Sequence, residues 1–137
     1  MANMLSKLVF DRIGVPANRK FLDLAALRHR FISGNVANAS TPGYKARDID
    51  FKTEFARMTS RTSHIAGYRT DQRHIPLGSH QARQPEVQTE PIARGDMNSV
   101  DIDREVSNMA QNELLFTVGA RLLQKKFEGL RKAITSK

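Results

Sequence analysis

Three carboxylates that lie close together in the sequence are the nearest approach to a catalytic pattern. A pair among Asp48, Asp50 and Glu54 would suit general acid–base chemistry if it flanked a substrate. The 137-residue sequence supplies no positioned nucleophile, glycine-rich phosphate loop or partner histidine to complete such a site. We therefore expect these carboxylates to be structural and the protein not to be an enzyme. We expect no cofactor.

Histidines raise the question of a metal site in the middle of the chain. His64, His74 and His80 are spaced by ten and six residues in a proline-containing segment, which is not the spacing of a helical ligand pair. The sequence contains no cysteine, so thiolate ligands, cysteine nucleophiles and disulfides are excluded. We interpret the histidines as part of a solvated loop and expect no metal.

The chain is basic, with 22 Lys and Arg against 14 Asp and Glu and a formal net charge of +8. Such an excess fits nucleic acid, an anionic membrane surface or an acidic protein partner. Six arginines in residues 56–95 make a basic helical nucleic-acid-binding protein the alternative hypothesis. Only Tyr68 could stack on bases in that segment, so we favour a solvated face and expect no nucleic acid. A steep salt dependence of DNA affinity would favour the alternative.

Neither a membrane helix nor a secretory signal is evident. No stretch approaches the roughly 18 apolar residues of a membrane span, so we expect no membrane insertion. The early apolar run Leu8-Val9-Phe10 ends at once in Asp11-Arg12, too soon for the core of a signal peptide. Without a family for comparison, these features are typical of a soluble cytoplasmic protein.

Hydrophobic periodicity predicts a mainly α-helical protein. We expect an elongated two-helix coiled coil of the N- and C-terminal helices, with an extended, irregular or small β segment between them. Four regions follow: an N-terminal helical region at residues 1–40, a turn and extended arm at 41–55, a flexible polar segment at 56–97, and a C-terminal coiled-coil helix at 98–137.

The first main helix is predicted from about Ala17 to Ala39, with Pro16 well placed near its start. Its apolar residues cover more than half of the helix circumference, whereas one neighbour needs a stripe of only about 100°. We therefore expect several packing neighbours. Arg28 lies inside this apolar arc, where an unpaired charge is costly, so it should meet a carboxylate or a helix-end carbonyl.

The last helix carries a sustained seam with alternating spacings of four and three residues. The seam would be either a core within the chain or a surface for other subunits. Asp101 suits the N-cap position. Two helices that paired only with each other would bury little apolar surface against the entropy of ordering them, so we expect folding to be coupled to assembly. The seam residues are Ile102, Val106, Met109, Glu113, Phe116, Ala120, Leu123, Phe127, Leu130 and Ile134.

Between the helices, Pro42 ends the first one, and Pro42-Gly43 fits the centre of a type II turn. Residues 45–55 should then run extended. The seventeen residues from Asn35 to Phe51, NVANASTPGYKARDIDF, closely resemble the signature of the flagellar basal-body rod family, and their second half is most similar to its proximal rod members. The motif residues are Asn35, Asn38, Thr41, Pro42, Gly43 and Tyr44. His74-Ile75-Pro76, Asn98–Glu105 and Phe127–Ile134 also resemble family segments.

This resemblance implies a structural subunit of the proximal rod in the periplasmic part of the flagellar basal body, exported by the flagellar type III apparatus without a cleaved signal peptide. It implies self-association and, as neighbours, the rod proteins FlgC, FlgF and FlgG together with FliE and the MS ring. Asn35 and Asn38 would bond backbone groups at the turn, and the C-terminal seam would serve as both core and assembly surface. The expected assembly interface comprises Leu24, Leu27, Phe31, Ile32, Val36, Ile102, Val106, Met109, Phe116, Leu123, Phe127, Leu130 and Ile134.

Overall fold

The computed structural model describes residues 9–60, 84–91 and 98–135. Its helices are α2 (Val15–Ala37), α3 (Phe51–Thr59) and α4 (Ile102–Thr135), and residues 9–13 are also helical. Two short strands, β1 (Arg47–Asp48) and β2 (Gln88–Thr89), pair antiparallel with Arg47 opposite Thr89. The described part of the chain is thus mainly helical with a small sheet, as predicted. Supercoiling of the two long helices stays a prediction.

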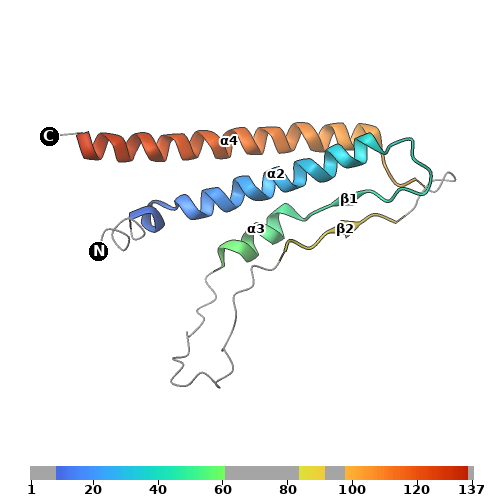
Figure 1. The fold of residues 1–137 in the computed structure, drawn as a ribbon, viewed down its shortest axis with the longest axis horizontal. Coiled ribbons are helices and arrows are strands. Elements are labelled where there is room, and N and C mark those ends of the chain that lie inside the picture. Colours follow the sequence, from blue (N-terminus) through green and yellow to red (C-terminus); the bar gives the residue numbers. More distant parts are fainter. Residues whose placement is uncertain (1–8, 61–83, 92–97, 136–137) are drawn as a thin grey trace, which may run out of the picture.

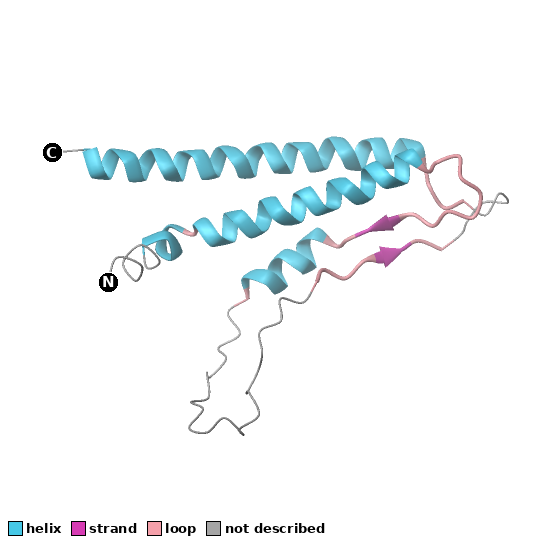
Figure 2. Ribbon diagram, in the orientation of Figure 1, coloured by secondary structure: helices cyan, strands magenta, loops and turns pink. Residues whose placement is uncertain are grey.

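The two long helices lie side by side and run in opposite directions, as Figure 1 shows. The strands and α3 lie along the other side of α2, so that α2 is packed between α4 and this side arm (Figure 2). The wide apolar arc of α2 therefore has two neighbours within the chain. None of the described helices combines the length and the apolar content that crossing a membrane requires.

Helix α2 begins and ends close to the predicted positions. Gly14 precedes it with a φ of 74°, a left-handed conformation that favours glycine, and Pro16 lies in its first turn. Beyond the helix, the Tyr44 N–H donates to the Thr41 carbonyl at 3.3 Å, and Gly43 has a φ of 75°. This is the geometry that a type II turn requires, with glycine at its third position.

Helix α3 corrects the prediction that residues 45–55 run extended. The extended path stops at Asp50, whose carboxylate accepts hydrogen bonds from the N–H (3.2 Å) and hydroxyl (2.7 Å) of Thr53. This N-cap starts the helix at Phe51. Phe51 and Phe55, one helical turn apart, then pack edge-on against the Phe21 ring of α2 at centroid distances of 5.0 and 5.4 Å. The two phenylalanines fix the arm to α2.

The fully buried apolar side chains gather where the arm, α2 and the start of α4 meet. They are few, so this part of the chain holds a small core beside the turn rather than a continuous one along the helices. Its members are Leu24, Ala25 and Ile32 of α2, Ala46 and Ile49 of the arm, and Val100 just before α4.

Candidate assembly site

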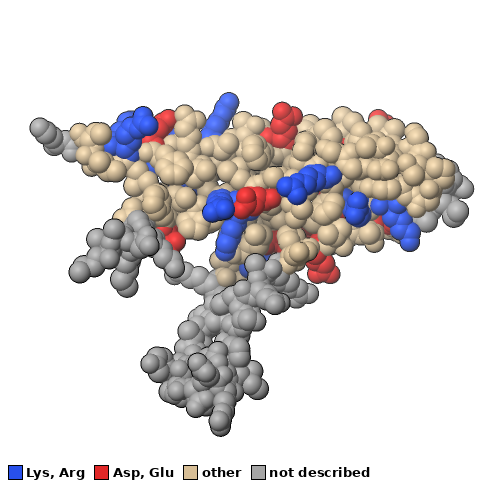
Figure 3. All heavy atoms as spheres, in the orientation of Figure 1, with Lys and Arg blue, Asp and Glu red and all other residues tan. Residues whose placement is uncertain are grey.

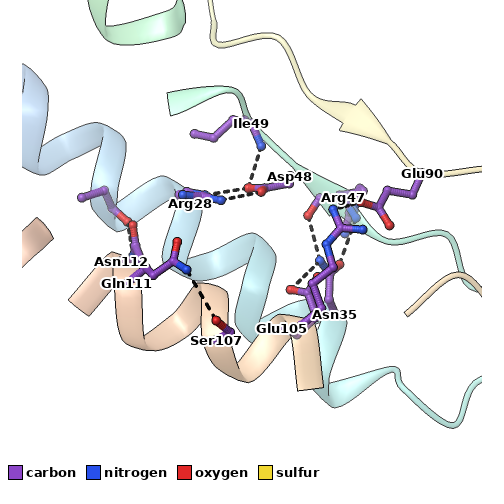
Figure 4. A network of polar contacts seen from close by, with 12 residues as sticks. Arg28, Asn35, Arg47, Asp48, Ile49, Glu90, Glu105, Ser107, Gln111 and Asn112 are labelled. Atoms are coloured by element: carbon purple, nitrogen blue, oxygen red, sulfur yellow. Dashed lines mark hydrogen bonds and ion pairs between the residues drawn. The ribbon is translucent and has the colours of Figure 1, made fainter. Parts of the chain in front are cut away.

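Asn35 is the centre of a polar network that joins α2, β1 and α4 (Figure 4). Its amide group donates to the Arg47 carbonyl (2.8 Å) and to the Glu105 carboxylate (3.2 Å). Its Oδ1 accepts from the Arg47 N–H (3.0 Å) and the Tyr44 hydroxyl (3.3 Å). All of these bonds form around a side chain that is buried. The predicted bonding of Asn35 to backbone groups is therefore confirmed.

The turn itself is held by two asparagines. Asn38 donates from its side chain to the Gly34 carbonyl at 2.8 Å, which confirms the prediction for this residue. Asn98, on the approach to α4, donates to the carbonyls of Asn38 (3.1 Å), Ala39 (2.9 Å) and Thr41 (2.9 Å). These carbonyls follow the end of α2 at Ala37, so Asn98 holds the turn closed and ties the approach to α4 to it.

Arg28 meets a carboxylate, as predicted from its position within the apolar arc. Its Nε and a terminal nitrogen donate to both oxygens of Asp48 at 2.9 and 2.8 Å (Figure 4). This bidentate bond raises the pKa of Arg28, although burial opposes the rise. One Asp48 oxygen also accepts from the Ile49 N–H at 2.8 Å. The pair therefore fixes β1 against α2, and Asp48 has the structural role expected from the sequence.

Four residues spaced by seven along α4 set its register against α2. Glu105 bonds Asn35, and the Asn112 amide donates to the Ala25 carbonyl at 3.0 Å. The Gly119 carbonyl accepts from Asn18 at 3.3 Å, and the Lys126 ammonium donates to the Gly14 carbonyl at 3.2 Å. The partners step backwards along α2, as an antiparallel pair demands. We call Glu105, Asn112, Gly119 and Lys126 the register ladder.

The register ladder makes one alignment of α2 and α4 specific, but it places polar or small residues where apolar side chains could have been buried. Asn112 is buried, and its Oδ1 has no hydrogen-bond partner among the described residues. An unpaired buried acceptor is costly, whereas an apolar residue there would tolerate several alignments of the helices. At Gly119 the helices approach so closely that a Cβ would lie 2.9 Å from the Phe21 ring. The ladder therefore favours one alignment at the expense of stability.

Burial raises the pKa of Glu105, and the negative charges of Asp48 and Glu90 add to this effect, while the bond from Asn35 and the charge of Arg104 oppose it. A raised pKa means that the folded chain binds this proton more tightly than the unfolded chain does. The stability contributed by protonated Glu105 is therefore complete below the ordinary glutamate pKa and is lost as pH rises through the raised value.

We expect Glu105→Gln, a neutral mimic of the protonated side chain, to remove this loss. The free energy of unfolding of the variant should exceed that of the wild type by an amount that grows from acidic to neutral pH. Urea denaturation followed by circular dichroism at several pH values measures the difference. Glu113→Gln, at an exposed position of the same helix, is the matched control. A difference independent of pH, or one that shrinks as pH rises, would contradict the prediction.

The predicted seam of α4 lies largely on the outside of the helix pair. Among its members Met109, Leu123 and Leu130 are half-buried. Five large apolar residues of the seam are exposed, and the expectation that they also form an intramolecular core is wrong, because the register ladder occupies that side of α4. We call these five the outer seam: Ile102 (52% exposed), Val106 (55%), Phe116 (44%), Phe127 (47%) and Ile134 (82%).

The α2 residues of the predicted interface are buried or half-buried within the chain, in contrast to the outer seam. Leu24 and Ile32 are buried within the chain, so they belong to its core and offer no surface to another subunit. Leu27, Phe31 and Val36 are half-buried. The Phe31 ring carries the guanidinium of Arg47 at 5.7 Å from its centroid, a cation–π contact within the chain. The exposed apolar surface is thus concentrated on α4.

A second set of exposed apolar residues was missed by the sequence analysis. Leu114, Val118 and Leu122 recur at intervals of four on α4 and are all exposed. Helical periodicity places them on the flank away from Phe116, outside the four–three pattern. A search for a second stripe in the same helix would have found them. Asn98 and the register ladder were also missed, because polar residues in a helix pair leave no apolar pattern.

The described residues offer no support for the metal-site and nucleic-acid hypotheses. Among residues 9–60, 84–91 and 98–135 no group of three or more His, Asp or Glu side chains could hold a metal ion. The three histidines of the metal hypothesis and the His74-Ile75-Pro76 element lie outside the described residues. Basic and acidic side chains are interspersed on the face of the molecule in Figure 3, without a continuous basic patch. No described feature favours the nucleic-acid alternative.

The described residues form an antiparallel helix pair with a closed Thr-Pro-Gly-Tyr turn, a side arm and an exposed apolar seam, features that suit a structural subunit. No family model matches the chain. Curated relatives do: "Flagellar basal body rod protein FlgB" of Cereibacter sphaeroides is 35% identical over 125 residues, which cover 90% of this chain and 94% of that protein. The protein of the same name from Escherichia coli (strain K12) is 35% identical over 123 residues, or 84% and 88% of the two chains.

The relative from Salmonella typhimurium is also 35% identical, over 117 residues that cover 80% of this chain and 83% of that protein. These matches span nearly the whole of both chains. The chain belongs to the FlgB family of flagellar basal body rod proteins.

Proposed function

We propose that this chain is a structural subunit of the proximal flagellar rod, which polymerises through its exposed apolar surfaces and transmits torque across the periplasm. The observation that carries the proposal is the outer seam. A helix of 34 residues presents a row of large apolar side chains to solvent along its length, although its own partner helix is already in place. Exposed apolar patches of this kind mark protein–protein contacts.

The polar contacts around the turn support a mechanical role. A rod subunit receives torque through its contacts with neighbouring subunits and must transmit it without deforming. Asn35, Asn98 and the Arg28–Asp48 pair bind the turn, the arm and both helices by hydrogen bonds. The register ladder then resists sliding of α4 along α2, because each step would break its bonds and drive Phe21 into α4. The subunit would behave as a single stiff element.

The finer assignments also belong to this proposal. The chain would reach the periplasmic rod through the flagellar type III apparatus, without a cleaved signal peptide. Its neighbours would be other copies of itself, the rod proteins FlgC, FlgF and FlgG, FliE and the MS ring. The four regions of the sequence would act as helical N-terminus, turn and arm, polar segment and C-terminal helix. The turn would fix where the arm leaves the helix pair and reaches a neighbouring subunit.

Charge on the outer seam should block assembly without unfolding the chain. We expect cells that carry Val106→Asp together with Phe116→Asp to export the protein but to lose swimming, because both side chains are exposed in the free chain and would be buried by a neighbour. A buried unpaired charge costs several kcal/mol. Motility in soft agar and the amount of exported protein are the measurements.

Thr117→Asp is the matched control, since Thr117 is exposed on the same helix but outside the seam. It should swim normally. Normal swimming of the double variant would refute the assembly role of the outer seam.

A further inference from the structure

A shallow groove separates residues 9–13 from the last turns of α4 at the free end of the helix pair, where the two stand apart (Figure 1). Its volume is about 510 Å³, whereas a water molecule takes only about 30 Å³ of the liquid, so the side chains of its walls do not fill it. Phe10, which is 39% exposed, lines one side. The α4 wall consists of Phe127, Leu130, Arg131, Ile134 and Thr135.

Gly14 divides residues 9–13 from α2. Its N–H donates back to the Asp11 carbonyl at 3.1 Å, and its carbonyl accepts from the Asn18 N–H at 3.2 Å. The hydrogen bonds of the first helix therefore end at the residue where those of the second begin. Both rotatable backbone bonds of Gly14 lie between its N–H and its carbonyl, so rotation about them swings residues 9–13 and leaves both hydrogen bonds formed.

The sequence around this hinge lowers the cost of such a rotation. Gly14 has a φ of 74°, and glycine reaches negative and positive φ about equally readily. Pro16 has no N–H, so the Arg12 carbonyl lacks the partner that would continue one helix into the next. Residues 9–13 are thus joined to α2 by a flexible residue and not by a continuous helix.

The chain beyond Gly14, in contrast, is braced against α4. The Lys126 ammonium donates to the Gly14 carbonyl at 3.2 Å and to Oδ1 of Asn18 at 3.4 Å. The Asn18 amide donates in turn to the Gly119 carbonyl at 3.3 Å. Among the described residues, no hydrogen bond or ion pair ties a side chain of residues 9–13 to α4 or to the arm. The brace therefore fixes one side of the hinge and leaves the other side free.

We propose that residues 9–13 form a strap, hinged at Gly14, that closes Phe10 onto the apolar wall of α4 while the chain is free. Closure withdraws apolar side chains on both sides of the groove from water, which favours the closed position. It also covers Phe127 and Ile134, the last two members of the outer seam, so that a neighbouring subunit must displace the strap. The closure itself is independent of the proposed function, whereas this autoinhibitory role rests on it.

Distances between two nitroxide spin labels, measured by double electron–electron resonance, test the closure in the full-length chain. Because the chain lacks cysteine, Arg12→Cys with Lys132→Cys places one label on the strap and one beside the groove, both at exposed positions. In dilute samples we expect two populations, one at the separation in the structure and one shorter. Phe10→Asp should reduce the shorter population at least about threefold, because closure would place a carboxylate among apolar side chains.

A second label pair provides the matched control. Arg30→Cys with Arg121→Cys spans α2 and α4 on the braced side of the hinge, again at exposed positions. It should give a single population that Phe10→Asp leaves unchanged, which also shows that this variant folds. A single, unshortened population for the strap pair would overturn the closure and leave the rod role standing. A shorter population that Phe10→Asp does not reduce would overturn it equally.

The autoinhibitory role is tested in the same chain at rising concentration. Labelled protein is diluted into an excess of unlabelled wild type, and sedimentation velocity measures association in the same samples. We expect the shorter population to disappear as the chains associate. Association with the shorter population fully retained would overturn the autoinhibitory role. A chain that shows both populations but never associates would keep the strap and remove the proposed self-association.

Discussion

Replacing Asn98 by aspartate is expected to lower the free energy of unfolding by about 3 kcal/mol or more at neutral pH, because the change sets a buried, charged oxygen against three carbonyl oxygens. The side chain is 2% exposed, and its amide donates to the carbonyls of Asn38, Ala39 and Thr41. A carboxylate has nearly the same shape but would place an acceptor against three acceptors. Urea denaturation followed by circular dichroism measures the loss.

Acid should restore part of the stability of this variant, since a protonated aspartate can donate to one of the carbonyls. Asn108→Asp, at a half-buried position on α4, is the matched control and should change stability little. Equal unfolding curves for the wild type and Asn98→Asp would show that the hydrogen bonds of Asn98 do not stabilise the turn.

Gly119→Leu is expected to separate the helices at the centre of the pair and to cost about 3 kcal/mol. A Cβ there would lie 2.9 Å from Cδ1 and 3.0 Å from Cε1 of Phe21, and 3.0 Å from a methyl group of Leu22. The Phe21 ring has no room to withdraw, because Phe51 and Phe55 pack edge-on against it. The side chain of leucine would push the arm away from α2 as well as α4 from α2.

Gly129 of the same helix provides a sharp comparison. A Cβ there meets nothing within 4 Å. Gly129→Leu should therefore stabilise the chain by about 0.5–1 kcal/mol, since leucine is the better helix former. Opposite signs for one substitution at two glycines of one helix are the expected result of denaturation experiments. Similar effects at both sites would contradict close approach at Gly119.

The sequence was informative wherever a local rule decides the structure. Pro42-Gly43 admits few conformations other than the observed turn, and Asp101 caps α4 by accepting from the N–H groups of Asp103 (3.1 Å) and Arg104 (3.4 Å). The carboxylate partner of Arg28 followed from the cost of burying an unpaired charge. Such predictions succeed because the deciding residues lie within a few positions of one another or share one strong constraint.

Tertiary contacts decided the rest. The spacing of Asp50 and Thr53 is compatible with an extended arm as well as with a helix cap. The helix is favoured because it lets Phe51 and Phe55 pack against the Phe21 ring. The side of α4 that faces α2 depends on Gly119, Asn112 and Glu105, whose polar and small side chains give no apolar signal. The most regular apolar pattern in the sequence proved to mark a surface, and the inner contact follows a neighbouring face of the helix.

The placement of the outer seam has a physical reason. Folding within the chain needs one unambiguous alignment of α2 and α4, which polar bonds and a close glycine contact supply. Assembly needs surface that remains unsatisfied until a neighbour arrives, which apolar side chains supply. Exchanging the two faces would yield a more stable monomer with little reason to polymerise. Dividing the helix in this way keeps the seam available for the rod.

In the proposed rod, a neighbouring subunit covers the outer seam. Because the chain has no cysteine, Val106→Cys introduces a single thiol into the exposed row, near the start of α4. A maleimide reagent should label this thiol rapidly in the free chain and slowly in purified basal bodies, with rapid labelling restored when the basal bodies are denatured. Equally rapid labelling of free and assembled protein would contradict the account.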